Sequence, residues 1–164
     1  MIRFWPILFI ALWVGCRVNY SFTGGDTGDA RTMSVELLQA RAPLSTPQSA
    51  QTLTETIRDL LLAQTPLKLA SRDGDVQYSG AITGYDVQPV SIQANETAAL
   101  NRLTITVSIS YVNTLDPKKN LETTISRFED YSSSQDLATV EEQLIQNIGK
   151  QLSQDIFDRT LGNW

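Results

Sequence analysis

Hydrophobic and polar residues alternate along this chain with two different periods, and these periods separate expected strands from expected helices. The clearest alternation lies at residues 102–111, where every second position is apolar and Thr or Ser fills most of the positions between. Its apolar positions are Leu103, Ile105, Val107, Ile109 and Tyr111. This spacing predicts a strand with one buried face and one wet face.

Three further segments have the strand period. The first covers residues 32–37. The second begins at Val76, and its pattern slips at Gly84 before it continues, as a β-bulge would cause. The third covers residues 121–131, is rich in Thr and Ser, and follows a run of turn-forming residues. The last three strands in the chain are therefore expected to form a meander.

Two segments have the helical period instead. The first helix is expected to begin at Pro47, with Thr46 as its N-cap, and to stop before Thr65 and Pro66. The second is expected over residues 137–161, with an apolar stripe along one side. Gly149 lies inside this helix, where glycine costs roughly 1 kcal/mol relative to alanine. We therefore expect either a bend at Gly149 or a backbone packed closely against it.

The order of these elements is β-α-β-β-β-α. A sheet with one apolar face must cover that face, and two amphipathic helices can do so. The sequence therefore predicts an α+β fold in which two helices pack on one face of a roughly four-stranded mixed sheet. There is no internal repeat, and one domain is expected over residues 31–164.

The amino terminus has a different pattern. Arg3 precedes an uninterrupted apolar run from Phe4 to Val14, which is the layout of a secretory signal. As a helix this run would reach only about 16 Å, far short of the ~20 residues that span a bilayer core. Gly15 and Cys16 follow, and the site resembles a bacterial lipobox, although Trp13 stands where that motif prefers Leu. Residues 1–15 are therefore expected to be a signal peptide.

Cleavage there would make Cys16 the first residue, carrying a covalent diacylglycerol and an N-acyl chain such as palmitate. Two or three buried acyl chains, at ~0.8 kcal/mol per CH₂ group, would anchor the protein permanently. Residues 16–30 are rich in turn formers and are expected to be a lipidated N-terminus and flexible linker. The alternative for Cys16 is a buried free thiol, since it is the only cysteine and has no disulfide partner.

Composition reduces the number of functional classes that the chain can belong to. The chain has 164 residues, a formal net charge of −5, 41% hydrophobic residues and no His. Without His it cannot build a Ser-His-Asp triad or a His-containing zinc site by itself, and its acidity argues against nucleic acid as a partner. Asp73-Gly74-Asp75 has the form of a metal-binding carboxylate pair but lies where a turn is expected. An enzyme is therefore the weaker class, with no catalytic residue, metal or further cofactor expected.

Several short segments match a known family in their order and placement. They are Cys16 with Tyr20–Gly24, the strand residues Asn101–Val107, Asp155–Phe157, and Asn163 with Trp164. On these segments the chain resembles the LptE lipopolysaccharide-assembly lipoproteins over essentially its whole mature length.

The resemblance implies a lipoprotein on the periplasmic face of the outer membrane. It implies a plug inside the β-barrel of the translocon protein LptD, help in assembling that barrel, and contact with lipopolysaccharide during its insertion. It also implies two helices over a four-stranded sheet, and it brings no catalytic motif.

Lipopolysaccharide carries phosphate and carboxylate groups, which Arg and Lys recognise. The candidates are Arg102, Lys118, Lys119 and Arg127, all on or beside the two paired strands. Arg102, Arg127 and Tyr131 are candidate anchors for lipopolysaccharide or a partner, because that strand pair is expected to be least covered by the helices. The alternative for Lys118 and Lys119 is a solvated hairpin tip.

The Thr and Ser residues of these strands also have two interpretations. They are either ordinary exposed strand formers or a hydrogen-bonding surface suited to a polar barrel lumen. A competing function is a generic periplasmic pilot or binding lipoprotein that serves another outer-membrane complex, since it would share the signal and the small α+β body.

Overall fold

A computed structural model describes residues 25–90 and 99–162. The expected signal peptide (residues 1–15), Cys16, Tyr20–Gly24 and the terminal Trp164 lie outside these residues, so the predictions for them stay predictions. The described residues include all the strands and helices expected from the sequence.

The strands form one mixed sheet in the order β3-β1-β4-β5-β6, with β2 paired to β4. Pairing is parallel between β1 and its neighbours and antiparallel through β4, β5 and β6. The sheet has six strands, where the sequence predicts roughly four. The two additional strands, β2 and β3, have two residues each and are too short to show an alternation. The strands are β1 (Thr32–Val35), β2 (Gln39–Ala40), β3 (Lys68–Leu69), β4 (Val76–Val90), β5 (Leu100–Asn113) and β6 (Leu121–Ser132).

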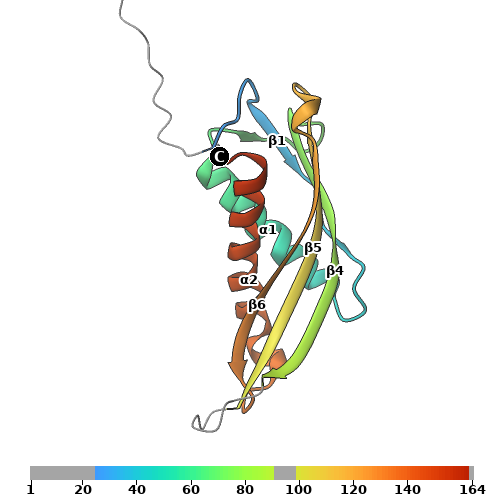
Figure 1. Cartoon of the computed structure of the whole chain (residues 1–164), viewed down its shortest axis with the longest axis vertical. Helices are drawn as coiled ribbons and strands as arrows, with labels where there is room; N and C mark the ends of the chain where they lie inside the picture. The colour runs from blue at the N-terminus through green and yellow to red at the C-terminus, as the bar shows by residue number, and fades with distance from the viewer. Residues whose placement is uncertain (1–24, 91–98, 163–164) are drawn as a thin grey trace, which may run out of the picture.

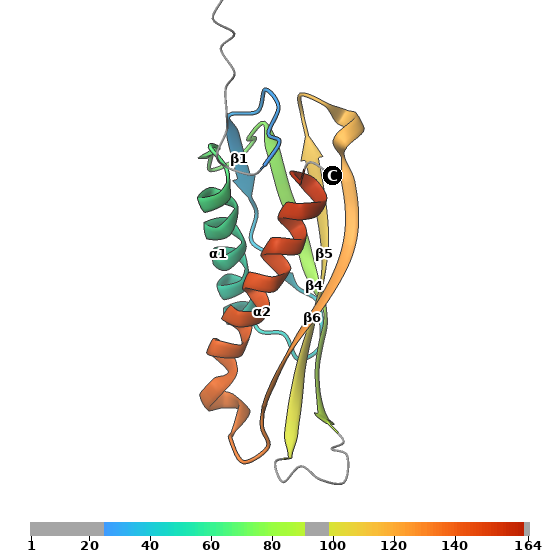
Figure 2. The ribbon, with the colours of Figure 1, turned by 60° about the vertical axis from the view of Figure 1, so that its left-hand side comes forward.

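Both helices, α1 (Pro47–Gln64) and α2 (Leu137–Thr160), lie side by side on one face of this sheet (Figures 1 and 2). Thr46 caps α1 as predicted: its hydroxyl accepts from the Ser49 amide, and the Ser49 hydroxyl accepts from the Thr46 amide. The predicted α+β class is therefore confirmed, with both helices in the expected places.

The meander is also confirmed. The register of β4 against β5 shifts between Ile82 and Gly84, where the sequence pattern slips. After the carboxyl end of β5, the hairpin that leads to β6 contains the short 3₁₀ helix η2 (Pro117–Lys119). Asp116 caps η2 by accepting from the Lys118 amide.

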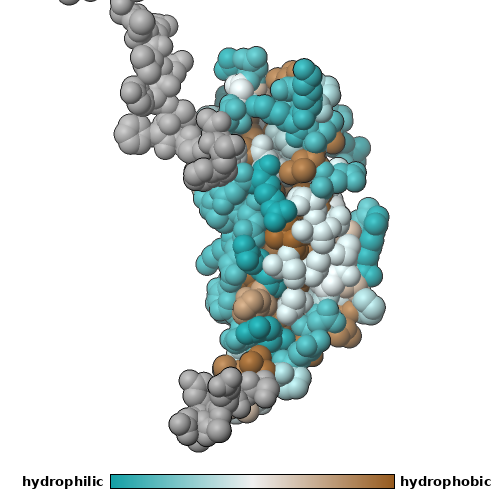
Figure 3. All heavy atoms as spheres, in the orientation of Figure 1, coloured by the Kyte–Doolittle hydropathy of each residue, from teal (hydrophilic) through white to brown (hydrophobic). Residues whose placement is uncertain are grey.

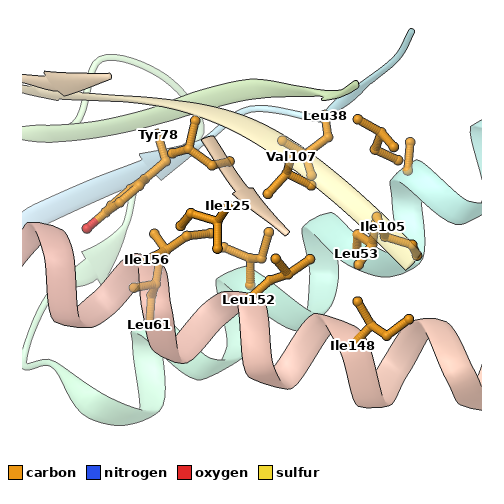
Figure 4. Close-up of a cluster of buried hydrophobic side chains, with 14 of the residues drawn as sticks. Leu38, Leu53, Leu61, Tyr78, Ile105, Val107, Ile125, Ile148, Leu152 and Ile156 are labelled. Carbon is orange, nitrogen blue, oxygen red and sulfur yellow. The ribbon is translucent and has the colours of Figure 1, made fainter. Parts of the chain in front are cut away.

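The core lies between the sheet and the helices (Figure 4). Ile105 and Val107 of β5 are fully buried against Leu53 of α1 and Leu152 and Ile156 of α2, all inaccessible to solvent. The alternation in β5 therefore assigns the buried face correctly. Burying each such side chain contributes about 1.5–3 kcal/mol relative to leaving it exposed.

Helix α2 continues unbroken through Gly149. A Cβ atom at this position would lie 3.1 Å from Cγ2 of Thr56 and 3.3 Å from a methyl carbon of Leu53, both in α1. The glycine therefore permits the close approach of the two helices, and the near neighbours are side chains of α1 rather than its backbone.

The end of the expected linker packs against the domain. Gly25 forms an antiparallel bridge with Gly162, and the Asp26 amide donates to the Leu161 carbonyl at 2.7 Å. Ala30 is buried. Because of these contacts, residues 25–30 belong to the folded body. A turn-rich composition predicts flexibility and carries no information about such docking.

Candidate functional site

The sheet face opposite the helices is rich in hydroxyl groups. Side chains of β4, β5 and β6 at this face pair across the strands, and the Thr106 hydroxyl donates to the Ser126 hydroxyl at 3.0 Å. Figure 3 shows a pale zone of intermediate hydropathy over the strands, next to the strongly hydrophilic surface of the helices. We call this surface the open face; its Ser and Thr residues are Ser79, Thr104, Thr106, Ser108, Ser110, Thr124 and Ser126.

A polar groove of about 320 Å³ lies at the side of the open face, where the segment around β2 meets β4 and β5. Arg41 lines it and donates from Nε and Nη2 to the Gln39 side-chain oxygen, at 3.0 and 2.7 Å. Ser79, Ser110 and Glu122 complete much of the wall. The groove extends the hydrogen-bonding character of the open face.

Arg102 lies on the open face, as expected. Its guanidinium forms a two-pronged ion pair with Asp130 on β6, with N–O distances of 2.7 and 2.9 Å. The same group lies 3.7 Å from the ring centre of Phe128, a side chain that is 47% exposed. The hydrogen bonds of this pair raise the pKa of Arg102 and lower that of Asp130. Arg102, Phe128 and Asp130 form the arginine cluster of the open face.

Arg127 and Tyr131 lie on the other side of the sheet from Arg102, toward α2, so the expectation that the helices leave this strand pair least covered does not hold at these two residues. Arg127 pairs across the strands with Ile105, and its guanidinium binds Asp155 of α2 with both N–O distances at 2.6 Å. Tyr131 is only 7% exposed and belongs to the core. The physical reason is that side chains alternate along β6, and its odd-numbered residues point toward α2.

These odd-numbered residues connect β6 to α2 by polar contacts that the sequence reasoning missed. Besides Arg127, Glu129 accepts from Gln151 at 3.2 Å, and Thr123 accepts from Arg159 at 2.6 Å. Gln151, Asp155 and Arg159 are each four residues apart on α2 and so share one side of the helix. That spacing was the available signal, because it places three polar groups in a row beside the strand. We call these contacts the polar seam.

Lys118 and Lys119 lie in η2 at the tip of the β5–β6 hairpin and are exposed, as the solvated-tip alternative expected. Lys119 also contacts the N-terminal segment, with its Nζ 3.2 Å from Asp26 Oδ2. This hydrogen bond, together with one from the Gly28 amide, lowers the pKa of Asp26. The hairpin tip is therefore connected to the point where the chain enters the domain.

The Asp73–Asp75 segment is a turn, as interpreted from the sequence. Asp73 has a φ of +52°, and Gly74 lies so close to the backbone of Met33 and Ser34 that a Cβ atom would clash at 2.6 Å. Asp75 accepts from the amides of Arg31 and Thr32 and from the Thr32 hydroxyl, and these hydrogen bonds lower its pKa. Among residues 25–90 and 99–162, no group of three or more acidic or thiol side chains could hold a metal ion.

Comparison with known proteins places the chain in a family. The model of the family described as LptE, lipopolysaccharide-assembly, matches residues 30–160, which is most of the chain. The chain belongs to the LptE family. The resemblance stated from the sequence is thus confirmed, and because the LptE family is non-enzymatic, so is the expectation that this chain is not an enzyme. No curated protein matches the chain.

Solved structures, among them two lipoproteins, share the fold of this LptE-family chain. A minor lipoprotein from Acinetobacter baumannii is 16% identical with a TM-score of 0.51, covering 79% of this chain and 91% of that one. Rare lipoprotein B from Shewanella oneidensis is 15% identical with a TM-score of 0.50, covering 77% and 90%. The hypothetical protein CT253 from Chlamydia trachomatis is 7% identical with a TM-score of 0.53, covering 80% and 98%. At these identities the similarity shows the fold alone.

Membership of the LptE family makes the chain a lipoprotein of a lipopolysaccharide-assembly family. Within the part of the chain that the structure describes, no helix is long and apolar enough to cross a membrane.

Proposed function

We propose that this LptE-family chain is an outer-membrane lipoprotein that acts as the plug and assembly partner of an LptD-type β-barrel. In this role it is held on the periplasmic face by lipid on Cys16 and takes part in inserting lipopolysaccharide. The observation that carries the proposal is the hydroxyl-rich open face, which neither of the two described helices covers, in a chain of this family.

The chemistry of the open face fits a barrel lumen. Lumens of outer-membrane barrels are polar, and a hydroxyl group can both donate and accept hydrogen bonds. A surface of Ser and Thr can therefore exchange water for lumen side chains without leaving charges unpaired. Arg102 already has Asp130 as its partner, so burying this pair avoids the cost of burying a single charge.

The arginine cluster is the candidate anchor of this contact. Interfaces concentrate their binding energy in a few central aromatic and Arg side chains, and Phe128 with Arg102 supplies both kinds on the open face. Arg127 and Tyr131 are not proposed as anchors, because the polar seam and the core engage them.

Lipopolysaccharide contact is proposed for cations that face solvent. Guanidinium binds phosphate and carboxylate in the same geometry, but Asp130 already engages Arg102, which is assigned here to the barrel contact. Lys118 and Lys119 at the hairpin tip remain candidates as point charges.

Co-purification tests the proposal. An affinity-tagged chain is purified from detergent-solubilised outer membrane, and the large barrel that accompanies it is identified by mass spectrometry, with lipopolysaccharide assayed in the same eluate. We expect an LptD-type barrel at near-equal amounts. Recovery of a different outer-membrane complex would instead support the pilot function, and recovery of the chain alone would contradict both.

A cysteine variant tests the lipid anchor at Cys16 separately from the plug function. Cys16→Ala should abolish labelling with radioactive palmitate while leaving the folded body intact, since the described core begins at Ala30. A Cys16→Ala chain that still incorporates palmitate would contradict lipidation at Cys16.

A further inference from the structure

Four separate parts of the chain converge at one end of the domain. The N-terminal segment pairs with the carboxyl end of the chain through Gly25 and Gly162. The hairpin tip reaches the same segment through Lys119 and Asp26, and β3 joins it through the Lys68 amide, which donates to the Arg31 carbonyl. Figure 1 shows this end at the top, where the start of β1, the β5–β6 hairpin and the end of α2 all lie.

Gly25, the first residue that the structure describes, lies at this same end. Gly25 lies nine steps along the chain from Cys16, with eight residues between them, and nine steps extend at most about 30 Å. Strand β5 alone has 14 residues, which corresponds to about 46 Å at the rise of an antiparallel strand. A lipid on Cys16 therefore keeps this end near the membrane surface, and the opposite end of the sheet lies beyond the reach of that tether.

Exposed leucines accompany lysines at this end. Leu115, next to η2, is 54% exposed and lies close in sequence to Lys118 and Lys119. Leu69 in β3 is 50% exposed and follows Lys68. Asp116 caps η2 and Asp26 pairs with Lys119, so among the described residues Lys118 is the hairpin lysine that forms no ion pair.

We propose that, before the domain enters the barrel, this anchor end, defined by Lys68, Leu69, Leu115, Lys118 and Lys119, rests on the phospholipid headgroups of the leaflet that holds the lipid of Cys16. The two leucines enter the boundary between headgroups and acyl chains, and the lysines bind the phosphates above them. Leucine with flanking lysine is the combination that interfacial segments use, because the lysine stem covers apolar surface while its charge stays in water. The inference rests on the lipid anchor of the proposed function.

The single cysteine makes a direct test possible. In the full acylated chain the Cys16 thiol is consumed, so an introduced cysteine is the only free thiol. Leu115→Cys and Leu69→Cys are labelled with a polarity-sensitive fluorophore, and the protein is reconstituted into vesicles of phosphatidylethanolamine and phosphatidylglycerol that contain lipids with quenchers near the headgroup. Leu44→Cys is the matched control, because Leu44 is 61% exposed but follows β2, which pairs near the middle of β4.

The expected result is blue-shifted emission and quenching about twofold or more stronger at 115 and 69 than at 44, as for a segment buried in the headgroup region. Combining Leu115→Cys with Lys118→Gln and Lys119→Gln should reduce this difference, as should raising the salt concentration. Circular dichroism checks that each variant is folded. Equal quenching at all three positions in vesicle-bound protein would overturn the inference and leave the lipid anchor standing.

Vesicle flotation distinguishes a failure of this inference from a failure of the proposed lipid anchor. Acylated protein that floats with the vesicles establishes the anchor independently of the fluorescence. Protein that stays at the bottom of the gradient would overturn the anchor, and with it this inference.

Discussion

The two faces of strand β5 differ in their exposure to solvent: one is buried and the other is partly exposed. Its odd-numbered residues, such as Ile105 and Val107, are inaccessible to solvent and lie under the helices. Its even-numbered residues, such as Thr104 and Thr106, are partly exposed on the open face. One strand thus supplies both the core and the candidate partner surface, so stability and function can be changed at adjacent positions.

The face of strand β6 toward α2 is not uniformly buried in the same way. Of its residues toward α2, Ile125 and Tyr131 are buried, whereas Arg127 forms an ion pair and is partly exposed. The edge of the sheet is thus attached to the helices by polar contacts where the centre is attached by apolar packing. We infer that the edge is the weaker part of the fold, because exposed ion pairs stabilise little.

The largest expected effect compares adjacent positions of β5. Ile105→Ala removes a fully buried side chain from the core and should lower the free energy of unfolding by about 2–5 kcal/mol. Thr104→Ala on the open face should change it by about 0.5 kcal/mol or less. Chemical denaturation of both variants measures the difference, and equal losses would mean that the two faces are assigned wrongly.

The second expected effect concerns the partner. Phe128→Ala removes the ring beneath the Arg102 guanidinium and, if the arginine cluster is an anchor, should weaken barrel binding by about tenfold or more, the 1.4 kcal/mol scale of an interface anchor. Stability should stay within about 0.5 kcal/mol of the parent chain, since the side chain is on the surface.

Leu44→Ala is the control for Phe128→Ala, because Leu44 is also a large exposed apolar residue but belongs to none of the strands β4, β5 and β6. Pull-down of each folded variant at matched expression measures barrel recovery. An unchanged recovery for Phe128→Ala would remove the arginine cluster from the interface.

Much of this fold could be predicted from the sequence, because the long elements carry many repeats of their period. The alternation of β5, the capping residues of α1 and the slip at Gly84 each have a local physical cause, and each appears in the structure. Strands β2 and β3, with two residues each, offer no period to detect. Their pairing depends on where the rest of the sheet lies.

The candidate site was harder to predict because it depends on register between strands. Arg102 and Arg127 look equivalent in sequence, since both are cations on neighbouring strands. Their different faces follow from the pairing of Tyr111 with Leu121 across the hairpin, which is set by η2 and by the Asn120 side chain accepting from the Asn113 amide. Such hairpin geometry is a contact between loop residues, and hydrophobic periodicity does not report it.

A smaller effect is expected at the polar seam. Arg127→Gln, Asp155→Asn and the double variant form a thermodynamic cycle, and the coupling energy should be about 1 kcal/mol or less, as for exposed ion pairs. The Arg127 side chain is 44% exposed, so raising the salt concentration should reduce this coupling. Chemical denaturation at low and high salt measures it. Coupling that is unaffected by salt would indicate that the edge of the sheet is held by buried contacts after all.

The smallest expected effect lies near the opposite edge of the sheet, where Asp75 accepts hydrogen bonds at the start of β1, next to the edge strand β3. Its pKa in the folded chain is lowered from the ordinary value of 3.8, first by the Arg31 amide and then by Thr32. A carboxylate with a lowered folded pKa stabilises the protein above its unfolded value, and this contribution is lost as the pH falls through the folded pKa.

The stability difference between the parent chain and Asp75→Asn should therefore be largest near neutral pH and should shrink as the pH falls below about 4. Thr32→Val removes the hydroxyl that donates to Asp75 and should move the acid transition of the parent toward higher pH, whereas Thr32→Ser keeps that donor and should not. Denaturation curves collected between neutral pH and pH 3 measure these changes. A difference for Asp75→Asn that is independent of pH would mean that the ionised carboxylate does not stabilise this edge, and that the amides of β1 are held equally well by a neutral acceptor.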